Sequence, residues 1–225
     1  MRTGQTSEFS TLVEALASEA LPQLKTIGRR ERRAAETRIR LFRSALQLFA
    51  ERGFPNVTVE DITEAADVGK GTFFNYFESK DQILGVLSEI QLGKVRQCLE
   101  EAIAGKQSIK SVVRQLFQRV GEEPGRSPQL ARAAISSFLA SEMIRTQVSR
   151  AMSEGREMLA EIITLGQKCG EVNPKLNKDE VALQAQQAAM GTILLWSLRG
   201  EPELTAAMEA TYQHFWSAIA VGTRS

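Results

Sequence analysis

The segment 57–80 constrains the fold most, because it carries the pattern of two short helices joined by a tight turn. Thr58 is a favoured residue at a helix N-cap, and the acidic Asp61 three residues later suits the positive end of a helix. Three apolar residues recur on one helical face, Val59, Ile62 and Ala66. These signals predict a first helix over residues 58–66.

A second helix is expected to begin near Lys70, directly after the turn. Asp67 tolerates a left-handed backbone better than most residues, and Gly69 is a good N-cap. Two aromatic residues one helical turn apart would face inward, Phe73 and Phe77. The outward face would then present polar groups that suit base edges and phosphates, on Lys70, Thr72, Asn75 and Tyr76. The pattern predicts a helix-turn-helix whose second helix enters the major groove of DNA. The alternative is an ordinary helical hairpin of an all-helical core, in which the aromatic residues serve only for packing.

Residues 33–87 resemble the TetR family of bacterial transcriptional regulators, most specifically in the string TFFNYFESKDQIL at 72–84. The resemblance implies an all-α protein in which a three-helix DNA-binding head is joined by a long helix to a helical ligand-binding and dimerisation domain. Three positions depart from the usual family pattern, Asp67 for Gly, Gly69 for Ser and Phe74 for Tyr. The family's phosphate contact at the third position is therefore not expected. The residues assigned to DNA binding are Arg33, Thr58, Lys70, Gly71, Thr72, Asn75, Tyr76 and Lys80.

A basic arm precedes this segment. Seven arginines and two glutamates lie between residues 29 and 43, in a chain whose formal net charge is only +1. Such an arm suits a phosphate backbone or a minor groove, where neutralised phosphates release counterions. A solvated charged face is the alternative interpretation of such a run. Its position next to the helix-turn-helix favours DNA.

Composition argues against several other classes of protein. A di-iron enzyme in a helical bundle needs paired Glu and His ligands, and the chain has one histidine, His214, which we expect in the core or lining a pocket. We therefore expect no enzyme, no metal and no other cofactor. The two cysteines show no paired spacing. No apolar run reaches membrane-spanning length and no secretory signal is evident, so a cytoplasmic protein without a membrane partner is expected.

The six prolines all fall between periodic segments, and no window shows sustained strand-like alternation. The sequence therefore predicts helices throughout. The expected ranges are 33–52, 58–66, 70–77, 79–104, 108–121, 128–143, 146–169, 178–199 and 202–220. We divide the chain into an N-terminal extension, a DNA-binding domain and a ligand-binding and dimerisation domain, at 1–28, 29–80 and 81–225.

The last two helices are the candidate dimer interface. The resemblance implies that they pair with their counterparts in a second subunit as a four-helix bundle, and two reading heads must lie about 34 Å apart to read one operator. The residues assigned to this interface are Ala182, Ala185, Ala189, Ile193, Trp196, Met208 and Phe215. Periodicity leaves open the alternative that both helices belong to the core of the monomer.

Large or pliable apolar residues of the C-terminal helices are candidates for an effector pocket, with a few polar anchors. They are Arg114, Phe117, Phe138, Met143, Gln147, Met152, Gln187 and Met190, together with Trp196. Most residues of this kind belong to the core. A moderately apolar small molecule is the expected effector.

These expectations combine into one function, a homodimeric regulator, expected to be a repressor, that binds a palindromic operator and is released by a small apolar effector. The alternative is a constitutive DNA-binding protein whose helical body docks a protein partner.

Overall fold

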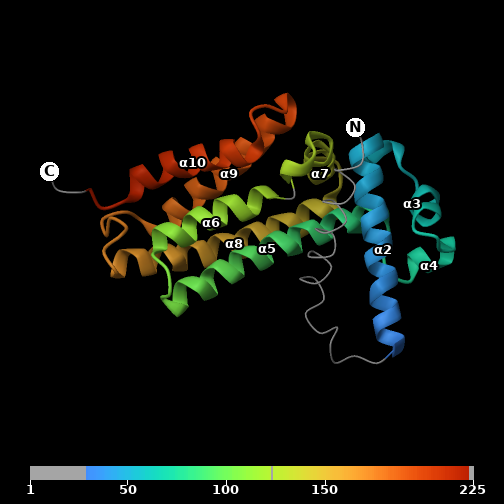
Figure 1. Ribbon diagram of the computed structural model, residues 1–225, viewed down its shortest axis with the longest axis horizontal. Helices are drawn as coiled ribbons and strands as arrows, with labels where there is room; N and C mark the ends of the chain where they lie inside the picture. Colours follow the sequence, from blue (N-terminus) through green and yellow to red (C-terminus); the bar gives the residue numbers. More distant parts are fainter. Residues whose placement is uncertain (1–28, 123, 223–225) are drawn as a thin grey trace. The chain divides into compact units, whose positions relative to one another are not determined.

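The computed structural model describes residues 29–122 and 124–222, and their regular structure is helical, as the sequence predicts (Figure 1). The elements follow in the order α2 (Arg29–Arg52), η1 (Phe54–Asn56), α3 (Val59–Ala65), α4 (Lys70–Phe74), α5 (Lys80–Ala104), α6 (Ile109–Glu122), η2 (Pro124–Arg126), α7 (Pro128–Ala140), α8 (Glu142–Lys168), α9 (Lys178–Arg199) and α10 (Leu204–Ile219). Within the described part, extended pairing is limited to an isolated bridge between Val172 and Ala220. The predicted N-terminal extension, 1–28, lies outside the described residues.

The chain forms two compact units, Met1–Ile90 and Gln91–Ser225. Helix α5 contributes residues to both units. The sequence-based domain boundary after residue 80 falls at the first residue of α5, and this assignment of domains stays a prediction.

The first unit is built around α2, which packs against α3 and η1. This helix begins at Arg29, earlier than predicted, so the basic arm is part of the helix itself. Gly53 follows its last residue with a φ of 80°, a left-handed conformation that glycine adopts without strain. The core of the unit contains Leu41, Phe42, Leu46, Phe49, Ile62, Phe73, Phe77, Ile83 and Leu84.

The second unit packs helices lengthwise around a large apolar cluster (Figure 1). Helix α9 contacts α6, α7, α8 and α10, and α10 also contacts α6. Tyr212 is 1% exposed at the centre of the cluster, and its hydroxyl donates to the carbonyl of Lys110 at 3.1 Å. A Cβ atom at Gly166 would meet Cγ2 of Val172 at 2.6 Å, so α8 can pass this segment closely only with glycine there.

The boundary between α7 and α8 lies at Ser141, whereas the sequence placed the end of the first helix at 143. The hydroxyl of Ser141 accepts a hydrogen bond from the amide of Ile144 and so caps α8. No proline or glycine marks this boundary, but a serine followed by Glu142 is an N-terminal signal that identifies it.

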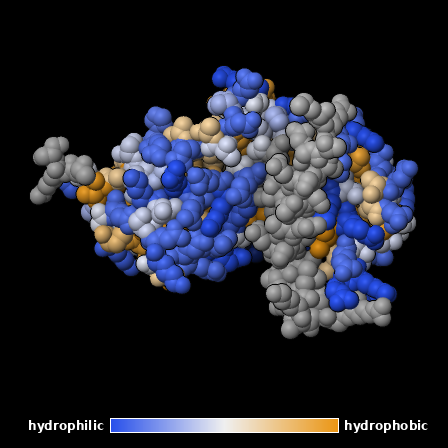
Figure 2. Space-filling view, viewed as in Figure 1, coloured by the Kyte–Doolittle hydropathy of each residue, from blue (hydrophilic) through white to orange (hydrophobic). Residues whose placement is uncertain are grey.

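Hydrophilic residues cover most of the visible face of the second unit, and apolar residues form smaller patches among them (Figure 2). Several large apolar side chains are nevertheless exposed along one helix, α9: Leu183, Leu194, Leu195 and Leu198. In the part of the chain that the structure describes, no helix combines the length and the apolar character needed to cross a membrane.

Candidate nucleic-acid interface and effector-binding unit

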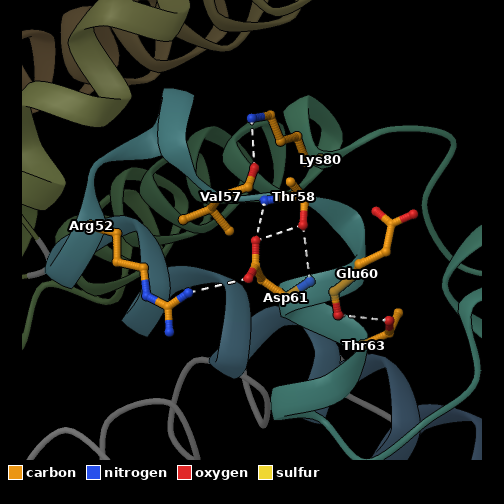
Figure 3. A network of polar contacts seen from close by, with 7 residues as sticks. All are labelled: Arg52, Val57, Thr58, Glu60, Asp61, Thr63 and Lys80. Atoms are coloured by element: carbon orange, nitrogen blue, oxygen red, sulfur yellow. Dashed lines mark hydrogen bonds and ion pairs between the residues drawn. The ribbon is translucent and has the colours of Figure 1, made fainter.

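The N-terminus of α3 is held by a capping box, as the sequence predicted for Thr58 (Figure 3). The amide of Asp61 donates to Oγ1 of Thr58 at 3.1 Å, and the amide of Thr58 donates to Oδ2 of Asp61 at 2.7 Å. Hydrogen bonds from Thr58 lower the pKa of Asp61, and Arg52 at the end of α2 adds an ion pair at 3.2 Å. Because these bonds engage the hydroxyl of Thr58, its first role is to begin α3.

Lys80 ties the start of α5 to the segment that precedes α3. Its Nζ donates to the carbonyl oxygens of Phe54 at 2.9 Å and Val57 at 2.8 Å, the second of which is drawn in Figure 3. The same ammonium lies 4.4 Å from the ring centroid of Phe54. An ammonium has three N–H donors, and two of those of Lys80 are used by these carbonyl oxygens. One donor therefore remains for the phosphate contact predicted for Lys80.

The turn between α3 and α4 has the geometry that the sequence predicted. Asp67 has a φ of 52°, the only positive value among the described non-glycine residues, and Gly69 is the N-cap of α4. Phe73 and Phe77 point into the core, 0% and 2% exposed, with ring centroids 5.6 Å apart. Arg38 of α2 lies 5.7 Å from the centroid of the Phe77 ring. These contacts position α4 on the unit.

The sequence placed the end of this helix at 77, but α4 ends at Phe74 and Asn75 is its C-cap. Five of the eight residues predicted to bind DNA lie on α4 or in the two residues that follow it. Lys70, Gly71 and Asn75 are exposed, and Thr72 and Tyr76 are half-buried. A Cβ atom at Gly71 would meet nothing within 4 Å, so the side of α4 at Gly71 is open. Of the other three, Arg33 is exposed on α2, Thr58 caps α3 and Lys80 begins α5.

Comparison with known proteins supports a regulatory role for this helix-turn-helix. Residues 41–87 match the family model for bacterial regulatory proteins of the tetR family. The regulator TcmR of Streptomyces glaucescens is 45% identical over 56 residues, 25% of each protein, and the repressor DhaR of Mycobacterium sp. strain GP1 is 25% identical over 177 residues, 76% of this chain and 89% of DhaR.

The chain belongs to the TetR family. A solved structure, FadR from Bacillus subtilis in complex with stearoyl-CoA, superposes with a TM-score of 0.68 at 20% identity, covering 80% of this chain and 98% of FadR, and so shares its fold. The chain is thus a DNA-binding transcriptional regulator, and its relatives are regulators rather than enzymes.

In the second unit of this TetR-family regulator, the residues that the sequence assigned to a dimer interface lie in or against the core of a single chain. Six of the seven residues assigned to the interface are buried inside a single chain, namely Ala182, Ala185, Ile193, Trp196, Met208 and Phe215, and Ala189 packs against the same cluster. These side chains cannot meet a second subunit while the core is intact. This burial favours the alternative that periodicity left open, in which these residues belong to the core of the monomer, because α9 is apolar on both sides and periodicity alone does not distinguish the two.

The residues assigned to an effector pocket occupy three kinds of environment. Phe117 is buried, and its ring centroid lies 5.5 Å from that of Phe215. Arg114 is exposed and forms an ion pair with Glu209 at 3.0 Å. Met143 and Gln187 are also exposed, and the half-buried members are Phe138, Gln147, Met152 and Met190.

His214, expected in the core or a pocket, is exposed on α10. The indole Nε1 of Trp196 is buried and has no hydrogen-bond partner among the described residues.

A buried polar network between α5 and α6 was missed by the sequence-based reasoning. Lys94 is 5% exposed, and its Nζ donates to the carbonyl of Arg119 at 2.6 Å and to Oε2 of Glu122 at 3.0 Å. Arg119 donates in turn to both carboxylate oxygens of Glu101 and to Sγ of Cys98. Burial raises the pKa of the Cys98 thiol. Lys94, Cys98 and Glu101 share one face of α5, and this spacing is the sequence signal from which the network could have been predicted.

Proposed function

We propose that the protein is a homodimeric, ligand-responsive repressor that binds a palindromic operator in the bacterial cytoplasm and is released by a small apolar effector. The observation that carries the proposal is the polar set of α4 and the two residues after it, in which Lys70 and Asn75 are exposed and Tyr76 is half-buried, while Phe73 and Phe77 anchor the segment in the core. A helix held in this way enters the major groove and presents donors and acceptors to base edges.

Selection of bound sequences from random DNA tests the DNA-binding part. We expect a palindromic motif, and Lys70→Ala or Tyr76→Ala should weaken operator binding by about 1–3 kcal/mol if each contacts a base. Lys106→Ala, an exposed lysine of the second unit, is the matched control and should leave operator affinity unchanged. A selection that yields no motif refutes this part of the proposal.

The homodimer is supported by the outer side of α9. Leu194, Leu195 and Leu198 lie on the side opposite the core, because successive residues turn by about 100°. Beside them α10 presents small or polar exposed residues, including Ala206, Ala210, Gln213, Ser217 and Ala218. The Oγ1 atoms of Thr192 and Thr211 lie 2.7 Å apart and join the two helices. We propose that this α9–α10 outer face meets the same face of a second subunit across a two-fold axis.

The effector is proposed to contact Trp196. Buried polar groups in folded proteins almost always have a partner, so an indole N–H without one suits an acceptor oxygen of a bound molecule. FadR of Bacillus subtilis was solved with stearoyl-CoA, and for this reason fatty acids and acyl-CoA thioesters are the first probes.

Fluorescence of a Trp216→Phe variant tests this contact, because Trp196 is then the single tryptophan. An effector that binds beside it should shift or quench the emission, and Trp196→Phe, which keeps an aromatic ring, should weaken binding. By reciprocity, operator DNA must lower effector affinity by the same factor by which effector lowers operator affinity. Equal effector affinities with and without operator would exclude that molecule as the inducer. If no apolar probe binds, the result favours the alternative in which the body docks a protein partner.

A further inference from the structure

Glu60 of α3 forms an ion pair with Lys70, the first residue of the reading helix α4. Both side chains are largely exposed, at 60% and 58%. The hydrogen bond from Lys70 is the main cause that lowers the pKa of the Glu60 carboxyl. The charge of the first reading-helix residue is thus paired before any DNA is bound.

This ion pair has no evident structural task. The carboxylate of Glu60 points away from the capping box at the start of α3 (Figure 3), where Asp61 makes the contacts to Thr58 and Arg52. Packing of α3 on α4 is provided by buried side chains such as Ile62 and Phe73. Exposed ion pairs contribute little to stability. A function in DNA recognition explains the pairing better.

Pairing with Glu60 affects the two modes of DNA binding differently. Non-specific binding depends on lysines and arginines that neutralise phosphates, and a carboxylate beside Lys70 cancels its charge and repels the phosphate. Specific binding needs an ammonium held near a base edge. An ammonium has three donors, so Lys70 can keep its bond to Glu60 and still donate to the guanine O6 or N7.

We propose that Glu60 is a specificity-determining residue that positions Lys70 for a guanine edge and suppresses its contact with phosphates. This inference rests on the proposed DNA-binding function of α4. Discrimination gained by penalising the wrong partner is a general route to specificity.

The test compares Glu60→Gln with Glu64→Gln in the full-length protein, using the selected operator and a scrambled duplex at several salt concentrations. Both substitutions remove one negative charge from α3, and Glu64 is exposed, with no side-chain ion pair found for it in the described part of the chain. In Glu60→Gln, Lys70 becomes free to neutralise one more phosphate of the scrambled duplex. The salt slope should then steepen by about 0.9, which corresponds to a change of about 3.5-fold in relative affinity between roughly 0.05 and 0.2 M salt.

We expect Glu60→Gln to lower the ratio of operator to scrambled affinity by about threefold or more at low salt, and Glu64→Gln to leave it nearly unchanged. In a Lys70→Ala background, Glu60→Gln should no longer change the ratio, because the effect passes through Lys70. Equal effects of the two glutamate substitutions, or an effect that persists without Lys70, overturn the inference while the DNA-binding function stands. If the wild-type protein selects no DNA motif at all, both proposals fail.

Discussion

Replacing Leu198 with alanine tests the α9–α10 outer face most directly. The substitution removes Cγ and both Cδ atoms, which at about 0.8 kcal/mol per buried carbon group amounts to about 2.4 kcal/mol for full burial. Leu198 is 65% exposed in the single chain, so covering that fraction contributes about 1.6 kcal/mol. Across a two-fold axis the contact occurs twice, so the substitution removes about 3 kcal/mol of dimer stability in total. A loss of about 3 kcal/mol raises the dimer Kd roughly 100-fold.

Sedimentation velocity over a dilution series measures this Kd. Ile103→Ala is the matched control, because Ile103 is also 65% exposed but lies near the end of α5, away from α9 and α10. We expect the control to dimerise like the wild-type protein. A Leu198→Ala protein with an unchanged Kd, or a wild-type protein that stays monomeric at every concentration, would refute the reasoning about this face.

Three further outcomes follow from individual contacts. Lys80→Met should destabilise α3 by about 1–3 kcal/mol, since a buried carbonyl loses its donor, and unchanged amide hydrogen exchange in α3 would contradict this. The lowered pKa of Asp61 means that its contribution to stability is present above the ordinary aspartate pKa and is lost as pH falls through the lowered value. Asp61→Asn should therefore be less stable at neutral pH but less sensitive to acid, as measured by hydrogen exchange of α3 along an acid titration. Ellman's reagent should titrate one thiol in the folded chain, the exposed Cys169, and a second only after unfolding, because Cys98 is buried; two rapidly reacting thiols in the folded protein would be inconsistent with this core.

Most helix boundaries were predictable because their signals are local. A capping residue such as Thr58 or Ser127 bonds to amides only a few residues away, so its effect is readable from sequence. The same holds for the left-handed Asp67 between α3 and α4. The boundary at Ser141 was misplaced because its signal is one serine without a flanking proline or glycine.

Site residues were harder to predict where a side chain has two uses. Lys80 was assigned to a phosphate, and its carbonyl contacts connect residues far apart in sequence. Glu60 was not considered, because a pairing with Lys70 across the turn depends on how α3 and α4 pack. Local sequence contains neither contact.

The sequence by itself determined the all-helical class, the helix-turn-helix and the inward direction of Phe73 and Phe77, because each follows from turn chemistry and from apolar spacing within a few residues. Only the tertiary structure decided which side of α9 forms the core. Trp196 and Leu198 stand on opposite sides of a helix that is apolar on both, so the helical period is satisfied by either orientation. The choice depends on packing against α6, α7, α8 and α10, and those contacts join residues that sequence spacing does not relate.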